Sequence, residues 1–110
     1  MIVPNAENAV VDIRKLTNYC LNTNHEIGKH KAYIFKSMFD LTVENAERLR
    51  EELPFAVKNS EAQAGKFDKF GQRHTVDFEM RQGAKKAIIR SGWIIEAEAD
   101  FPHLTTCFVL

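Results

Sequence analysis

The sequence predicts an α+β fold, with about three N-terminal helices packed on one face of a C-terminal antiparallel β-meander. Apolar residues recur at helical spacing through the first half of the chain, whereas apolar and polar residues alternate through much of the second half. Because helices come first and strands then follow one another, neighbouring strands are expected to pair directly, without crossovers. A length of 110 residues fits a single domain spanning 1–110.

The first two helices are expected over residues 13–21 and 29–39. Asp12 precedes the first, and its short carboxylate side chain can accept a hydrogen bond from the free backbone amides of the first turn. An Asn-rich loop closed by Gly28 follows, because asparagine and glycine favour turns. The second helix then carries an apolar stripe of Ala, Phe and Met side chains.

A third helix is expected after Thr42, a residue type that caps helices. Leu49 and Leu53 lie at helical spacing on its inward side. Pro54 is expected to end or bend this helix, since proline lacks the amide hydrogen and collides with the preceding turn. The polar segment 59–72, which holds two glycines, is expected to be a loop.

Three strands are expected in the second half, over residues 74–80, 86–99 and 103–110. A hairpin turn that contains glycine joins the first two. A short additional strand fits the apolar run at residues 9–11. Trp93 lies on the apolar face of its strand and is expected to anchor the core.

Composition excludes several classes of protein. The 15 Lys and Arg residues balance the 15 Asp and Glu residues, which argues against binding nucleic acid by net charge alone. Residues 58–90 nevertheless hold eight cations and four acids, which fits either a basic cleft or an ordinary solvated surface. No apolar run approaches the roughly 20 residues of a membrane-spanning helix, and residues 1–12 lack the pattern of a secretory signal. A cytoplasmic protein with no membrane partner is therefore expected.

The sequence holds no motif for a metal ion, a nucleotide cofactor or a serine nucleophile, so neither a cofactor nor a metal site is expected. Cys20 and Cys107 lie among apolar residues and are expected to be buried, inert thiols. His74 lies on the apolar face of its strand. This position fits a hydrogen-bonded histidine at the edge of the core better than a general base.

The start of the second helix is the most informative segment. Gly28, Lys29, His30 and Lys31 lie beside the free backbone amides of the first turn, where the helix dipole also favours an anion. This helix tip is therefore a candidate phosphate site. Lys31 also lies four residues before Phe35, on the inward side of the helix. The alternative stays open that its stem only packs across the edge of the core.

Arg90 lies in the middle of the second expected strand, where an arginine without a partner is rarely found. It either pairs with Asp77 or Glu79 on the neighbouring strand or binds a phosphate through its planar fork. His103, near the start of the last strand, is a candidate acid or base at neutral pH. Thr106 can donate a hydrogen bond to a phosphate.

Four segments carry a resemblance to a known family: IVPNAENAVVDIRKLTNYCLN, HEIGKHKAYIF, RSGWIIE and PHLTT. In the same order they resemble a bacterial family described only as a domain of unknown function. Its members are toxin-like C-terminal modules of large secreted proteins and small stand-alone proteins beside a partner gene. The matching positions are His25, Gly28, Lys31, Ala32, Phe35, Arg90, Trp93, Leu104 and Thr106. Glu26, Ser91 and His103 depart from the pattern, where the family usually has Pro, Thr and Arg.

The order of helices and strands also resembles the barnase, EndoU, colicin and RelE class of metal-independent ribonucleases. The resemblance implies a toxin-like domain that cleaves RNA by stabilising charge on a phosphate and moving protons. The catalytic candidates are then Lys31, Arg90, His103 and Thr106. The substrate-binding candidates are His25, Gly28, Lys29 and His30, the last also a second candidate for proton transfer.

The alternative hypothesis is a non-catalytic interaction module, or a degenerate toxin that has kept only its partner surface. Such a domain binds a small antitoxin or immunity protein through its basic face and its sheet edge. The apolar C-terminal strand 104–110 would otherwise be covered by a second copy of the chain, as a homodimer. RNA is the expected partner of the first hypothesis, and a protein is the expected partner of the second.

Overall fold

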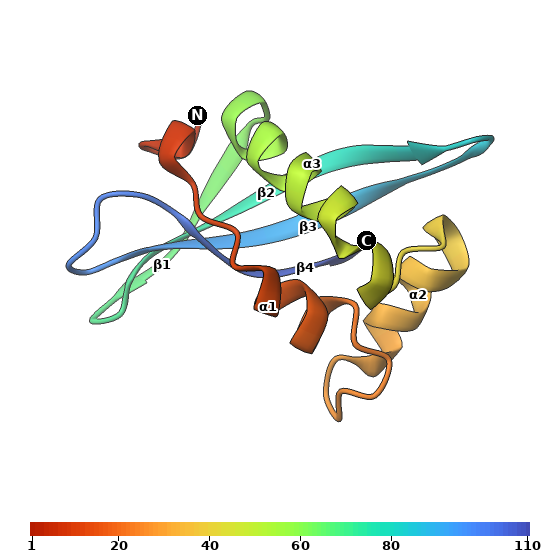
Figure 1. The fold of residues 1–110 in the computed structure, drawn as a ribbon. Helices are drawn as coiled ribbons and strands as arrows, with labels where there is room; N and C mark the ends of the chain where they lie inside the picture. Colours follow the sequence, from red (N-terminus) through yellow and green to blue (C-terminus); the bar gives the residue numbers. More distant parts are fainter.

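The structure is a computed structural model that describes residues 1–110. Three helices and shorter turns lie on one face of a four-stranded antiparallel sheet with the order β1-β2-β3-β4 (Figure 1). The predicted α+β meander is thereby confirmed. The strands are β1 (Ala62–Asp68), β2 (Gly71–Gln82), β3 (Lys85–Glu96) and β4 (His103–Val109).

The helices begin close to where the caps and apolar stripes predict them. The second has the predicted bounds, the first divides into an α-helical turn and a π-helix, and the third opens with a 3-10 turn. In chain order they are η1 (Ala6–Asn8), α1 (Ile13–Lys15), the π-helix η2 (Leu16–Cys20), α2 (Lys29–Phe39), the 3-10 turn η3 (Val43–Asn45) and α3 (Ala46–Asn59). None of them combines the length and the apolarity needed to cross a membrane.

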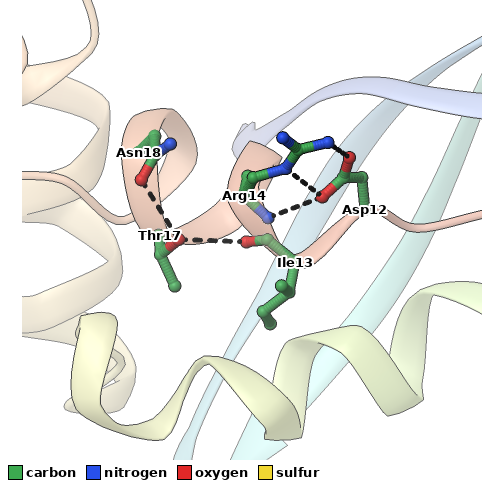
Figure 2. Close-up of polar contacts among 5 residues, drawn as sticks. All are labelled: Asp12, Ile13, Arg14, Thr17 and Asn18. Carbon is green, nitrogen blue, oxygen red and sulfur yellow. Dashed lines mark hydrogen bonds and ion pairs between the residues drawn. The ribbon is translucent and has the colours of Figure 1, made fainter.

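Asp12 caps α1 as predicted, through the contacts drawn in Figure 2. One carboxylate oxygen accepts a hydrogen bond from the backbone amide of Arg14 at 3.0 Å, and the Arg14 guanidinium donates to both oxygens, at 3.1 and 2.7 Å. These bonds lower the pKa of Asp12 to about 2, and the side-chain bond from Arg14 is the largest cause. One turn later, the Thr17 hydroxyl donates to the carbonyl of Ile13 at 3.3 Å.

Pro54 lies inside α3, so the helix does not end at the proline. A proline in a helix interior costs about 3 kcal/mol. Leu49, Leu53 and Val57, at four-residue intervals, are fully buried, and each such side chain contributes roughly 1.5–3 kcal/mol. Burial of this stripe therefore outweighs the missing hydrogen bond, and α3 continues to Asn59.

The segment 59–72 is not the loop that its polar composition predicts, because it contains β1 and the start of β2. β1 pairs with β2 from Ala62 opposite Val76 to Asp68 opposite Gly71, with a register shift between. Ala62 is its only buried residue, so the strand shows no apolar alternation that the sequence could reveal. Backbone pairing with β2, rather than side-chain burial, stabilises this strand.

The core lies between the helices and the near face of the sheet, with Trp93 at its centre as predicted. Trp93 is 1% exposed, and its indole Nε1 donates to the Ser91 hydroxyl at 2.9 Å. That hydroxyl donates in turn to the carbonyl of Val76 at 2.7 Å, so the buried polar groups of Trp93 and Ser91 are both hydrogen-bonded. The helices and turns contribute the fully buried side chains of Leu16, Phe35, Phe39, Leu49, Leu53 and Val57.

The N-terminal segment runs along the outer edge of β4 and forms a single parallel bridge between Val10 and His103. The amide of Val10 donates to the carbonyl of Pro102 at 2.9 Å, and the amide of Leu104 donates to the carbonyl of Val10 at 3.0 Å. The strand expected at residues 9–11 is thus reduced to one bridge. This bridge brings the start of α1 beside β4.

His74 faces the helices from β2 and is 4% exposed. It lies opposite Trp93 in register, and its ring nitrogen Nδ1 is buried without a hydrogen-bond partner. The expected histidine of the core is therefore present, but its hydrogen bonds are not all satisfied. Burial lowers the pKa of His74 below the ordinary 6.5, because the charged imidazolium is poorly solvated there.

His74 is expected to make the free energy of unfolding fall as the pH is lowered. The unfolded chain binds a proton at this residue below its ordinary pKa of 6.5, whereas the folded chain keeps the ring neutral. Stability is therefore undiminished above that pH and declines below it by up to about 1.4 kcal/mol per pH unit, until the folded histidine also protonates. Urea titrations from about pH 7.5 to about pH 5.5 on the parent and on His74→Phe measure the effect. Equal pH slopes in the two proteins would contradict it.

Candidate functional site

The open face of the sheet, on the side away from the helices, carries a row of side chains from four elements. Asp77 on β2 lies opposite Arg90 on β3, and Arg90 lies opposite Phe108 on β4. Residues directly opposite each other in an antiparallel pair share a face. Lys31 of α2 reaches this row, and its ammonium Nζ lies 3.9 Å from the centroid of the Phe108 ring. These four residues are called the open-face row below.

Asp77 holds the guanidinium of Arg90 in place. Nε donates to Oδ1 and Nη2 donates to Oδ2, both at 2.9 Å. These hydrogen bonds are the largest cause of a lowered pKa for Asp77 and a raised pKa for Arg90. Glu79, the other partner that the sequence allowed, pairs instead with Arg81 at 2.8 Å. Nη1 of Arg90 has no partner within the chain, and the side chain is 41% exposed, so the guanidinium still presents donors to an anion.

Lys31 is the cation of the open-face row that has no carboxylate partner. Its ammonium lies over the ring of Phe108 on β4. A cation above an aromatic ring at an exposed site gains roughly 0.5–1 kcal/mol. This contact positions the ammonium without neutralising it, which leaves the charge available to an anion.

Small side chains occupy the next position along the open face, where Thr75, Gly92 and Thr106 lie opposite one another. The register of β4 shifts here, and Thr105 is the extra residue. A Cβ added to Gly92 would lie 3.0 Å from the Thr105 hydroxyl oxygen and 3.1 Å from the Thr106 methyl carbon. The two threonines therefore flank the glycine, and this position is called the Gly92 gap below.

His103 lies beyond the Gly92 gap on the same face, opposite Ile94. Its ring stacks on Phe101, with the centroids 5.3 Å apart and the planes at 26°. At about 3.3 Å per residue, Ile94 lies roughly 13 Å along β3 from Arg90, with the gap midway between them. The open face thus carries all four catalytic candidates: Lys31, Arg90, Thr106 and His103.

His25 and Gly28, two of the substrate-binding candidates, shape the loop that leads into α2. The His25 Nδ1 accepts hydrogen bonds from the backbone amides of Ile27, at 3.1 Å, and Gly28, at 2.9 Å. The amide of Lys29 donates to the carbonyl of His25 at 3.0 Å. Gly28 packs so closely on Tyr19 that an added Cβ would lie 2.8 Å from its ring. These amides at the helix tip are therefore already occupied by His25.

The remaining two binding candidates, Lys29 and His30, are exposed in the first turn of α2. Cys20 and Cys107 are both buried, as predicted, and neither forms a disulfide. Interaction with Cys20, and then burial, raise the pKa of the Cys107 thiol well above its ordinary value. No group of three or more His, Cys, Asp and Glu side chains lies close enough together to hold a metal ion.

A polar pocket of about 480 Å³, called the β4-edge pocket below, lies where α1, η2 and the loop before α2 meet β4. Its lining residues are Asp12, Arg14, Lys15, Asn18, Tyr19, His25 and Thr105. Thr105 joins the pocket to the Gly92 gap. Of these residues, only His25 is a binding candidate from the sequence. Arg14 and Lys15 are not, because these cations approach β4 through the Val10 bridge, which no local pattern predicts.

Comparison with known proteins identifies the family of this chain. No curated protein and no solved structure matches it. A family model described as a domain of unknown function (DUF6883) matches residues 2–110. The expectation of a family described only as a domain of unknown function is thereby confirmed, and the chain belongs to the DUF6883 family.

Proposed function

We propose that the protein binds RNA on the open face of its sheet and cleaves it without a metal ion, as a toxin-like domain. The open-face row carries this proposal: the Lys31 ammonium lies over the Phe108 ring, and Arg90 lies opposite Phe108 in the register of β3 and β4, so two cations from different elements flank one aromatic residue on the side of the sheet away from the helices. Because the formal net charge is zero, attraction of a polyanion depends on such a local arrangement of cations rather than on total charge.

The Gly92 gap is the position that best fits the phosphate to be cleaved. Because glycine has no side chain, the surface of the sheet is recessed there, and Thr106 beside it offers a hydroxyl donor. Arg90 from one side and His103 from the other can extend over the gap. The β4-edge pocket adjoins the Gly92 gap through Thr105. It supplies further cations along the path of an extended RNA strand.

Cleavage of RNA needs little beyond positioning, charge stabilisation and proton transfer. The 2′-hydroxyl attacks the adjacent phosphorus, the bond to the 5′-oxygen breaks, and a 2′,3′-cyclic phosphate remains. Lys31 and Arg90 stabilise the charge that develops on the phosphoryl oxygens. His103 takes the proton of the 2′-hydroxyl or donates one to the departing 5′-oxygen, and a transfer of this kind contributes about 10²–10⁴-fold.

A second candidate function, a domain that docks a partner protein without catalysis, is favoured by one observation. Nε and Nη2 of Arg90 both donate hydrogen bonds to Asp77. This is the arrangement of an ion pair whose role is only to stabilise the sheet. In that case the open face would bind acidic side chains of an antitoxin-like partner. RNA cleavage separates the two functions directly.

The purified protein is expected to cleave a short fluorescein-labelled RNA in buffer that contains EDTA. The DNA of the same sequence is expected to stay intact, because it lacks the 2′-hydroxyl that attacks the phosphorus. Gel electrophoresis follows the products, and mass spectrometry identifies the cyclic phosphate end. RNA that is bound but uncut would reject cleavage and leave a non-catalytic function for the open face. RNA that is neither bound nor cut would reject the proposed function altogether.

A further inference from the structure

The edge strand β2 extends beyond its neighbour β1. β1 pairs with β2 only as far as Val76, so the backbone from Asp77 to Gln82 has a partner strand on one side alone, in β3. The carbonyl of Arg81 accepts a hydrogen bond from Nη2 of Arg48 on α3 at 3.1 Å, and therefore points away from β3. Because backbone groups alternate along a strand, Asp77 and Glu79 direct their N–H and C=O groups the same way.

A groove of about 740 Å³ lies between this free edge and the flank of α3. It is lined by Glu51, Glu52, Phe55, Ala56, Ser60, Asp77, Phe78 and Glu79. Phe55 is 68% exposed although it lies on the helix beside the edge. The groove thus combines free backbone donors and acceptors with an aromatic wall, which are the elements of strand addition.

We propose that this groove binds an extended segment of a partner protein in which basic and apolar residues alternate, added as a strand beside Asp77–Glu79. In an added strand, successive side chains point to opposite faces of the sheet. Those on the helix side would pack against Phe55 and Phe78. Those on the open side would meet the carboxylates of Asp77 and Glu79, which requires lysine or arginine at every second position.

The charge of the groove decides which occupant it fits. Four carboxylates and no cation line it. Three of them each form an ion pair with a different arginine outside the lining: Glu52, Asp77 and Glu79. The fourth, Glu51, has no ion-pair partner. A second copy of the chain would bring the same four carboxylates to the contact, which disfavours self-pairing. A basic segment of another protein instead gains electrostatic attraction.

The test uses a fluorescein-labelled octapeptide of alternating lysine and valine and measures binding to the full chain by fluorescence anisotropy. One comparison peptide replaces lysine with glutamate. Another keeps the lysines but carries N-methyl groups on the amides that would face β2, which blocks backbone pairing and preserves the charge. The variant Phe55→Ala removes the aromatic wall. Its matched control is Phe67→Ala, because Phe67 is also exposed but lies on β1 away from the groove.

The lysine–valine peptide is expected to bind the parent and the Phe67→Ala protein equally. Its affinity should fall at least about tenfold with N-methylation and with Phe55→Ala, and the glutamate peptide should not bind. Equal binding of the N-methylated or the glutamate peptide would overturn strand addition of a basic segment. Failure of the peptide to bind, together with dimerisation of the protein through Phe55, would also overturn the proposal. The occupant of the groove would then be a second copy of the chain. None of these outcomes depends on RNA cleavage.

Discussion

Replacing Lys31 by alanine is expected to reduce the rate of RNA cleavage by roughly 10²–10³-fold, the usual effect of removing one group that stabilises transition-state charge. The parent ammonium lies beside Phe108 and has no carboxylate partner, so no other side chain depends on its charge. The fold should lose only the contact with the ring, roughly 0.5–1 kcal/mol. Initial rates of cleavage of the fluorescein-labelled RNA, with thermal unfolding measured in parallel, check both expectations.

Two further variants separate a specific role from a loss of basic charge. Lys31→Arg keeps a cation above Phe108 and should retain most of the activity. Lys36→Ala removes an exposed cation from the last turn of the same helix and should cleave RNA like the parent. If Lys31→Ala also cleaves at the parental rate, the open-face row is not the catalytic site.

The substitution Gly71→Ala is expected to destabilise the protein by about 3 kcal/mol or more. Gly71 begins β2 with a φ of 137°, a conformation that strains other residues by roughly 1–3 kcal/mol. An added Cβ would lie 2.2 Å from the carbonyl oxygen of Ile95 and 2.8 Å from the Cα of Glu96. Both atoms are backbone, so β2 and β3 must separate locally and lose hydrogen bonds of about 1 kcal/mol each.

Gly83→Ala is the matched control for this effect. Gly83, in the hairpin turn, also has a positive φ, of 61°, but no atom lies within 4 Å of an added Cβ. The free energy of unfolding of Gly83→Ala should therefore fall only by the strain of the left-handed conformation, about 1–2 kcal/mol. Urea denaturation of the parent and both variants gives the free energies of unfolding. Equal losses in the two variants would show that the contact with Ile95 does not matter.

Sequence patterns were sufficient wherever a single element buried a continuous face or carried its own cap. The bounds of α2 follow from its apolar stripe and from the preceding glycine. Asp12 marks the start of α1 because its carboxylate bonds an amide only two residues away. Trp93 was correctly assigned to the core because alternation along its strand groups it with Ile89, on the face opposite the charged Arg90.

The same patterns failed where pairing or packing with distant residues decides the structure. β1 exposes most of its side chains and exists because β2 offers it a backbone partner. α3 passes through Pro54 because its buried leucines outweigh one lost hydrogen bond. In both cases the free energy of the local conformational preference was smaller than the stabilisation from tertiary contacts.

By itself, the sequence determined the α+β class, the helix caps and the core face of the central hairpin. Only the tertiary structure decided that Arg90 pairs with Asp77 rather than Glu79, and that Lys31 meets Phe108 on the open face. The physical reason is register. Periodicity states which face a side chain occupies, but which residues lie opposite one another depends on strand pairing between segments far apart in the chain.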